Sequence, residues 1–262
     1  MKVDLRNKNA LVCGGSRGIG LASAQLLADS GCRVFLLSRD ETALKESRQS
    51  LPRPFQQEHS YICCNMADTE QLKRNIETLL HRIGPIHILI NNSGGPAAGS
   101  LLHAKKEEFL DAFRQHLVSA HTLVQMLVPG MIQSGYGRII NIISTSVKQP
   151  LPNLGVSNTL RGAMANWAKT LANEMGEHGI TVNNVLPGAT RTQRLMELLE
   201  KKSVQTGIPT ETLEKKMKEE IPLRRFAEPA EVAAAVLFLA SPDAAYVNGI
   251  NLPVDGGRTS SL

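Results

Sequence analysis

The sequence is poor in aromatic residues, in cysteine and in long hydrophobic runs. Only 4% of its 262 residues are aromatic, and it contains three tyrosines and four cysteines. No hydrophobic run approaches the length that spans a bilayer, and the N-terminal MKVDLRNKNALVCGG is too weakly apolar for a signal peptide. These absences argue against a membrane span and a secretory leader, and they predict a soluble cytoplasmic protein with no membrane partner.

The cysteines show neither a CxxC pair nor the spacing of a disulfide framework. Cys13, Cys32, Cys63 and Cys64 each lie in or beside an apolar run of the kind that forms a buried strand. The pattern therefore predicts free, buried thiols in a reducing compartment, and no metal site.

Charge of one sign is not concentrated anywhere in the chain. The net charge is +5, but lysine and arginine alternate with aspartate and glutamate along the whole sequence. A nucleic-acid partner is therefore not expected, and the charge favours at most phosphorylated small molecules.

Short apolar runs alternate with helical patterns from one end of the chain to the other. Seven runs have the consecutive apolar residues of strands buried on both faces: 10–15, 33–38, 61–65, 87–92, 138–144, 181–187 and 250–254. Helical spacing occupies 18–30, 41–50, 68–82, 105–133, 157–177 and 229–240. This alternation predicts one α/β domain over 1–262, with a doubly wound, seven-stranded parallel sheet and helices on both faces.

One segment interrupts the alternation. Residues 193–225 contain two short amphipathic patterns separated by TGIPT, between a strand and the next regular helix. Because ligands bind at the carboxyl ends of such strands, we expect a helical lid over a pocket, with an ordinary surface hairpin as the alternative.

A glycine-rich turn follows the first strand and opens the first helix. In CGGSRGIG, Gly14, Gly18 and Gly20 permit a tight turn, a close approach of the backbone to a pyrophosphate, and close packing of helix on strand. The intervening Ser16, Arg17 and Ile19 belong to the same turn, and the helix N-terminus offers free N–H groups to phosphate oxygens. The turn predicts a dinucleotide site.

The end of the second strand selects the dinucleotide. An NAD site has a carboxylate there, whereas this strand ends in Ser38 and Arg39, with Arg17 nearby in the turn. Both arginines can bind a 2′-phosphate, so NADP(H) is favoured over NAD(H). Asp40 follows, and we expect it to cap the next helix.

Several motifs agree in order and spacing over residues 5–257. Together with the glycine turn, they are NNSG at 91–94, GRIINIIS at 137–144, LPGATRT at 186–192, IPLRRFAEPAEVA at 221–233 and VDGG at 254–257. This set resembles the short-chain dehydrogenase/reductase family, and within it the 3-oxoacyl carrier-protein reductases. The resemblance implies a single-domain Rossmann fold, NADP(H), and hydride transfer to or from a small-molecule carbonyl or alcohol.

The resemblance also assigns cofactor contacts. It implies that Asn91 supports the cofactor beside the fourth strand, and that Asn65, where the family usually has aspartate, meets the adenine together with Met66. The remaining implied contacts lie after later strands: Asn92, Ser93, Gly94, Pro187, Gly188, Thr190 and Thr192.

The family's catalytic Asn, Ser, Tyr and Lys do not all carry over. Ser144 is in place, but His116 occupies the Asn position, Ser157 the Tyr position and Arg161 the Lys position. No tyrosine occurs between Tyr136 and Tyr246, so a shifted register does not restore the phenol. Serine is a much weaker acid, and an uncompensated loss of general acid catalysis costs about 10²–10⁴ in rate.

Other proton sources remain open. His116, with an ordinary pKa near 6.5, is a candidate acting through a water and Ser144, with a packed histidine as the alternative. Lys148 is a second candidate, although a solvated loop lysine is the simpler interpretation. Arg161 keeps the positive charge beside the cofactor ribose but cannot relay a proton.

Three functions are therefore compatible with the residues. The first is an NADP(H)-dependent oxidoreductase with an atypical active site; the second is a catalytically silent NADP(H)-binding homologue that acts as a sensor or structural subunit. The third is a lyase or isomerase using the same pocket. The helical segments 105–133 and 157–177 resemble the family's dimer helices, which implies a homodimer or homotetramer.

Overall fold

A single parallel sheet forms the centre of the computed structural model, which describes residues 3–261. Its seven strands run in the order β3-β2-β1-β4-β5-β6-β7. They are β1 (Asn9–Cys13), β2 (Arg33–Ser38), β3 (Ser60–Cys63), β4 (Ile88–Asn91), β5 (Gly137–Ile142), β6 (Ile180–Pro187) and β7 (Asn251–Val254). The predicted α/β fold and its seven strands are confirmed.

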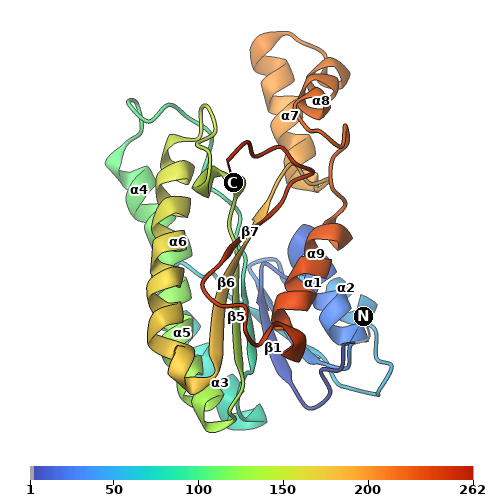
Figure 1. Cartoon of the computed structure of the whole chain (residues 1–262), viewed down its shortest axis with the longest axis vertical. Coiled ribbons are helices and arrows are strands. Elements are labelled where there is room, and N and C mark those ends of the chain that lie inside the picture. Colours follow the sequence, from blue (N-terminus) through green and yellow to red (C-terminus); the bar gives the residue numbers. More distant parts are fainter. Residues whose placement is uncertain (1–2, 262) are drawn as a thin grey trace.

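Two layers of helices cover the sheet (Figure 1). One layer comprises α1 (Gly18–Asp29), α2 (Glu41–Ser50) and α9 (Pro229–Ala240). The other comprises α3 (Thr69–Ile83), α5 (Ser119–Gln133) and α6 (Gly155–Met175). The short helix α4 (Lys106–Phe113) packs against α6 on this side. Each layer buries its own apolar cluster against the strands, which is why the central strands lack the alternating polarity of a one-sided sheet.

The segment 105–133 contains a break in regular α-helix that the sequence did not predict. Between α4 and α5, residues Arg114–Val118 form the π-helical segment η1, and His116 lies inside it. A π-turn inserts an extra residue into the helical ladder, so it changes the direction in which the side chains at this point project.

The two edge strands are less buried than the sequence predicted. Residues of β3 and β7 are only half-buried or exposed, because each of these strands has a neighbour on one side only. The prediction of a buried thiol is consequently wrong for Cys63, which ends β3 and is exposed, with its sulfur 3.5 Å from the Arg39 carbonyl oxygen. All four cysteines are free, and Cys13, Cys32 and Cys64 are buried.

A ladder of asparagines crosses the interior of the sheet. Asn91 donates to Asn141, Asn141 to Asn184, and Asn184 to Asn251, with side-chain distances of 2.9, 2.9 and 2.8 Å. These residues are register partners on β4, β5, β6 and β7. The expected cofactor contact of Asn91 is therefore wrong: its buried amide binds within the sheet, and it does not line the pocket described below.

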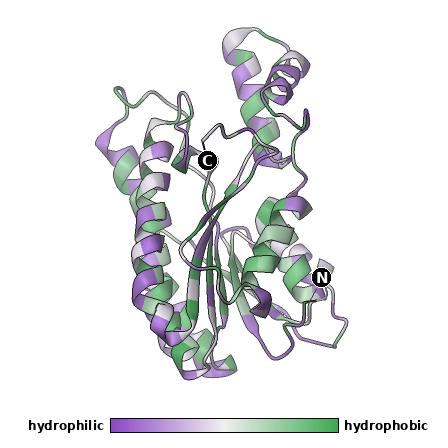
Figure 2. Ribbon diagram, viewed as in Figure 1, coloured by the Kyte–Doolittle hydropathy of each residue, from purple (hydrophilic) through white to green (hydrophobic). Residues whose placement is uncertain are grey.

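The interrupting segment forms two helices, α7 (Gln193–Thr206) and α8 (Thr210–Glu219), which project beyond the end of the sheet (Figure 1). They share a small core of Leu199, Leu213, Ile221 and Phe226. Figure 2 shows many hydrophilic residues on both, in contrast to the mostly hydrophobic α9. In the described residues, no helix combines the length and the apolar character needed to cross a membrane.

Candidate active site

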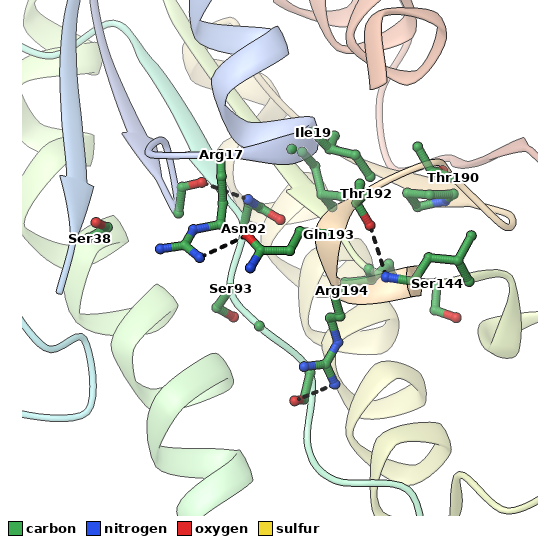
Figure 3. A pocket seen from close by; sticks show the side chains of 18 of the residues that line it. Arg17, Ile19, Ser38, Asn92, Ser93, Ser144, Thr190, Thr192, Gln193 and Arg194 are labelled. Carbon is green, nitrogen blue, oxygen red and sulfur yellow. Dashed lines mark hydrogen bonds between the residues drawn. The ribbon is translucent and has the colours of Figure 1, made fainter. Parts of the chain in front are cut away.

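A pocket of about 670 Å³ opens at the carboxyl ends of the strands, beneath the first turns of α7 (Figure 3). Of the predicted catalytic and cofactor-binding residues, all line this pocket except Gly20, Asn91, His116 and the candidate proton source Lys148. The lining set is Gly14, Ser16, Arg17, Gly18, Ile19, Ser38, Arg39, Asn65, Met66, Asn92, Ser93, Gly94, Ser144, Ser157, Arg161, Pro187, Gly188, Thr190 and Thr192. Residues scattered over 180 positions of sequence thus meet in one cavity.

The glycine turn is shaped for a close backbone approach. Gly14 has a φ of 58°, and a Cβ there would lie 2.7 Å from the Asn92 carbonyl oxygen. A Cβ on Gly20 would lie 2.1 Å from the Gly14 carbonyl oxygen, so Gly20 shapes the turn from behind without lining the pocket. No side chain caps the first turn of α1, which leaves its N–H groups available to a phosphate.

Charged side chains surround the end of β2. The Asp40 carboxylate accepts from the Ala43 backbone N–H at 3.0 Å, which confirms it as the cap of α2. The same carboxylate lies 2.8 Å from Arg17 Nη2, while Arg17 Nη1 donates to Gln193 on α7 at 3.2 Å (Figure 3). Arg39 is exposed and forms no ion pair among the described residues. Arg17 is therefore held by Asp40 and Gln193, whereas the Arg39 side chain is available to bind an anion.

Ser144 follows β5 and is well placed to donate a hydrogen bond. Its Oγ accepts the Ser146 backbone N–H at 3.1 Å at the start of a short 3₁₀ turn, Thr145–Val147. Because that contact uses an oxygen lone pair, the hydroxyl proton remains available to an oxygen atom in the pocket.

Ser157 and Arg161 lie one turn apart near the start of α6. Ser157 is half-buried, and Arg161 is only 7% exposed. Burial, together with the nearby Arg194, lowers the pKa of Arg161 to about 10. Its Nε is buried without a hydrogen-bond partner, and it forms no ion pair within residues 3–261. Burying a cation without a partner costs folding free energy. We therefore interpret the Arg161 guanidinium as a group that binds an anionic or polar ligand.

The expectation of a near-neutral pKa for His116 is wrong. Burial and the charges of Arg161 and Arg194 lower its pKa to about 3, although a contact with the Gly94 backbone opposes the shift. The ring lies behind the pocket wall, where its Nδ1 is 2.5 Å from the Ser93 hydroxyl. His116 is therefore neutral at physiological pH and fixes the loop after β4.

The sequence reasoning missed Arg194 and Gly95. Arg194 lies in the first turn of α7 and donates to the carbonyls of Gly95 and Pro96 at 2.9 and 3.2 Å (Figure 3). An arginine directly after the TRTQ stretch was the available signal, since Thr192 had already been placed at the pocket. Lys148, by contrast, is not among the residues that line the pocket.

Comparison with known proteins finds relatives that match nearly the whole chain. The family described as enoyl-(acyl carrier protein) reductase matches residues 14–259. The 3-oxoacyl-(acyl-carrier-protein) reductase of Vibrio cholerae is 33% identical over 97% of this chain and 98% of its own length. Carbonyl reductase family member 4 of Danio rerio is 34% identical over 95% of this chain and 96% of its own.

A solved structure agrees with this assignment. The L-sorbose reductase from Gluconobacter frateurii, complexed with NADPH and L-sorbose, superposes with a TM-score of 0.94, at 30% identity and over all of both chains. The matching family, the relatives and the shared fold lead to one conclusion: the chain belongs to the short-chain dehydrogenase/reductase family.

Proposed function

We propose that this protein is an NADP(H)-dependent oxidoreductase that interconverts a carbonyl compound and its alcohol. The observation that carries the proposal is the common pocket, which joins the glycine turn at one end to Ser144 and Arg161 at the other. The related L-sorbose reductase was solved with NADPH, which supports the same cofactor here.

The residues at the first end fit NADP(H). The missing Cβ atoms at Gly14 and Gly18 let the turn lie close against Asn92 and Thr192, and the uncapped N–H groups of α1 would bind a pyrophosphate. Arg39 and Arg17 would hold the 2′-phosphate, while Asp40, occupied by Arg17 and the α2 cap, would not repel it strongly. Asn65 and Met66 would border the adenine, and Thr190 and Thr192 the carboxamide.

The bound nicotinamide would supply a hydride to a carbonyl carbon, or accept one from an alcohol. In the reductive direction the dihydronicotinamide would give up the hydride of one C–H bond to form a C–H bond at the carbonyl carbon, and the carbonyl oxygen would take a proton from water. Ser144 would donate a hydrogen bond to that oxygen, and the Arg161 charge would stabilise the developing negative charge.

The proton must come from a source other than a phenol. Ser157 occupies the position of the family's tyrosine, but its short side chain leaves space in which a water can reach Ser144. His116 would contribute as a positioning residue through Ser93, since its low pKa keeps it neutral. We therefore propose solvent as the proton source, with Ser144 and Ser157 orienting a water.

The absent phenol also supports a second candidate, a catalytically silent NADP(H)-binding protein. Such a protein would bind NADP(H) in the cofactor half of the pocket without turning it over. Arg17 in the glycine turn hydrogen-bonds Gln193 on α7, so cofactor binding would move this helix and report whether the site is occupied. In either case we propose that α7 and α8 act as a lid.

We further propose that two copies associate through the α4, α5 and α6 side of the molecule. Leu110, Val118 and Ile132 on this side expose 58, 43 and 40% of their surface. Size-exclusion chromatography with light scattering tests this directly: a monomer at micromolar concentration would contradict it.

The function is tested by combining NADPH binding with turnover. NADPH fluorescence would measure binding, and absorbance at 340 nm would follow its oxidation with a panel of carbonyl compounds. Oxidation with at least one compound supports the oxidoreductase, whereas tight binding without any oxidation supports the silent protein. The double variant Ser157→Tyr/Arg161→Lys restores the family's pair, and it should raise turnover if only the acid limits the rate.

A further inference from the structure

Two guanidinium groups converge on one side of the pocket. A carbon atom placed on Gly95 would lie 3.5 Å from Arg161 Nη2 and 3.5 Å from Arg194 Nη2. The two arginines come from different elements, α6 and the lid helix α7, and both line the pocket together with Gly95. A small group in front of Gly95 therefore contacts both cations at once.

Neither cation is neutralised by the protein. Within residues 3–261, neither Arg161 nor Arg194 forms an ion pair, whereas Arg17, Arg191 and Arg225 each pair with a carboxylate. Arg194 donates only to the backbone carbonyls of Gly95 and Pro96, and the buried Nε of Arg161 has no acceptor. Glu197 also lines the pocket on α7 but lies in no ion pair with either arginine. The site thus holds two adjacent, uncompensated positive charges.

The cofactor does not supply a counter-charge for both. The negative charges of NADP(H) reside on its phosphates, which the glycine turn, Arg17 and Arg39 would hold at the other end of the pocket. The nicotinamide itself is neutral when reduced and positive when oxidised. One arginine can hydrogen-bond the ribose, but a ribose hydroxyl carries no charge. The two guanidinium groups would therefore still lack a negative counter-charge.

We infer that the substrate carries a carboxylate, which binds between Arg161 and Arg194 beside Gly95, so that the protein acts on an oxo acid and its hydroxy acid. Guanidinium groups bind carboxylates through paired hydrogen bonds, and the Nη2 atoms of both arginines lie within reach of one group in front of Gly95. The inference rests on the proposed oxidoreductase function. Reduction would convert the C=O group to CH–OH, with the hydride from NADPH and the proton from water, and leave the carboxylate unchanged.

The arrangement also gives the lid a role in recognition. Arg194 belongs to the first turn of α7, so a carboxylate would join the lid to the buried end of α6. An uncharged carbonyl compound of the same size would not make this connection. Selectivity for acids over their esters is therefore the property to measure.

The experiment compares acids with their methyl esters on the full-length protein. The probes are 2-oxobutanoate and levulinate with their methyl esters as substrates, and malonate with dimethyl malonate as non-reacting ligands of the NADP⁺ complex. Calorimetry measures binding and absorbance at 340 nm measures turnover. The variants are Arg194→Gln and Arg194→Lys, with Lys201→Gln as a control that removes one exposed charge from the same helix outside the pocket.

We expect each acid to bind at least about tenfold more tightly than its ester. Arg194→Gln should weaken the acids by at least about tenfold without changing ester affinity, Arg194→Lys should recover part of the loss, and Lys201→Gln should behave as wild type. Equal affinity for acids and esters, or equal losses for both with Arg194→Gln, would overturn the inference. Turnover of esters without preference for acids would overturn the inference and leave the oxidoreductase standing. Selective acid binding without turnover would support the carboxylate site and count against the proposed hydride transfer.

Discussion

The two ends of the pocket differ in how their cationic side chains are paired. At the phosphate end, the glycine turn, Ser38 and Arg39 have the residues expected for NADP(H), and Arg17 is matched by Asp40 at 2.8 Å. At the substrate end, Arg161 is buried and forms no ion pair among residues 3–261. This contrast supports the proposal that the phosphate end binds NADP(H) and that the substrate end binds an anionic ligand.

The charge balance shows the same difference. Arg17 forms an exposed ion pair with Asp40, and such a pair contributes little to the free energy of unfolding. Arg17 can therefore leave Asp40 to bind a phosphate with little loss of stability. Arg161 is buried and unpaired, so it destabilises the ligand-free protein.

The largest expected effect concerns the phosphate end. Gly20→Val would place a side chain against the Gly14 carbonyl, which lies 2.1 Å from the site of a Cβ. We expect a loss of NADPH affinity of about a hundredfold or more, because the turn must open by a backbone shift. NADPH fluorescence titration measures the loss. Gly162→Ala is the control, because a Cβ there meets no atom within 4 Å. Unchanged affinity in Gly20→Val would show that the turn does not bind the cofactor.

At the substrate end, Arg161→Met should stabilise the ligand-free protein. Burial lowers the pKa of Arg161 to about 10, well below its ordinary value. Below that pH the side chain is charged in the folded and unfolded states alike, and the folded protein bears the cost of burying the charge. Removing the charge should raise the free energy of unfolding by about 2 kcal/mol at pH 7, with loss of turnover. Urea unfolding measures the first effect, and a destabilised variant would refute the idea of an uncompensated charge.

Cofactor selection sharpens the comparison further. Arg39→Gln removes the exposed arginine after β2, which forms no ion pair with any residue between 3 and 261, so the preference for NADPH over NADH should fall about tenfold. The ratio of kcat/KM for the two cofactors, or of their dissociation constants, measures it. If the ratio does not change, Arg17 alone recognises the 2′-phosphate.

The smallest expected effect is a pH dependence of stability from His116. Its pKa of about 3 in the folded protein lies below the ordinary 6.5, so the unfolded state binds more protons between these values. The stability contribution is present above pH 6.5 and is lost as the pH falls, by about 1 kcal/mol at pH 5.5. His116→Asn should abolish this part of the loss.

Chemical denaturation at pH 7.5 and pH 5.5 measures the effect of His116. His103→Asn serves as the control, since His103 is an exposed histidine. Identical pH dependence in wild type and His116→Asn would show that the imidazole titrates normally in the fold.

The fold was predictable because its signals are local and repeated. The central strands are mostly apolar on consecutive positions and most helices have regular spacing, so the order of elements follows from the sequence alone. The edge strands were judged too buried, since a short run such as YICC does not show how many neighbours it will have. The asparagine ladder depends on the register of four strands, which local patterns do not encode.

The site was predictable where residues act through motifs and not where they act through packing. The glycine turn and Ser144 stand in motifs and line the pocket as expected. The pKa of His116 depends on burial inside a π-helical segment and on two arginines distant in sequence. Arg194 was missed because its meeting with Gly95 and Arg161 arises only from the placement of α7.

Transfer of the hydride itself tests the central claim most directly. NADPH carrying two deuterium atoms at C4 is incubated with wild-type protein and 2-oxobutanoate or levulinate, and the hydroxy acid is analysed by mass spectrometry. The account predicts a product one mass unit heavier than that formed with ordinary NADPH, with the deuterium on the former carbonyl carbon. Tight binding of NADPH with no deuterated product from any acid or ester would contradict it and identify the protein as a silent cofactor binder.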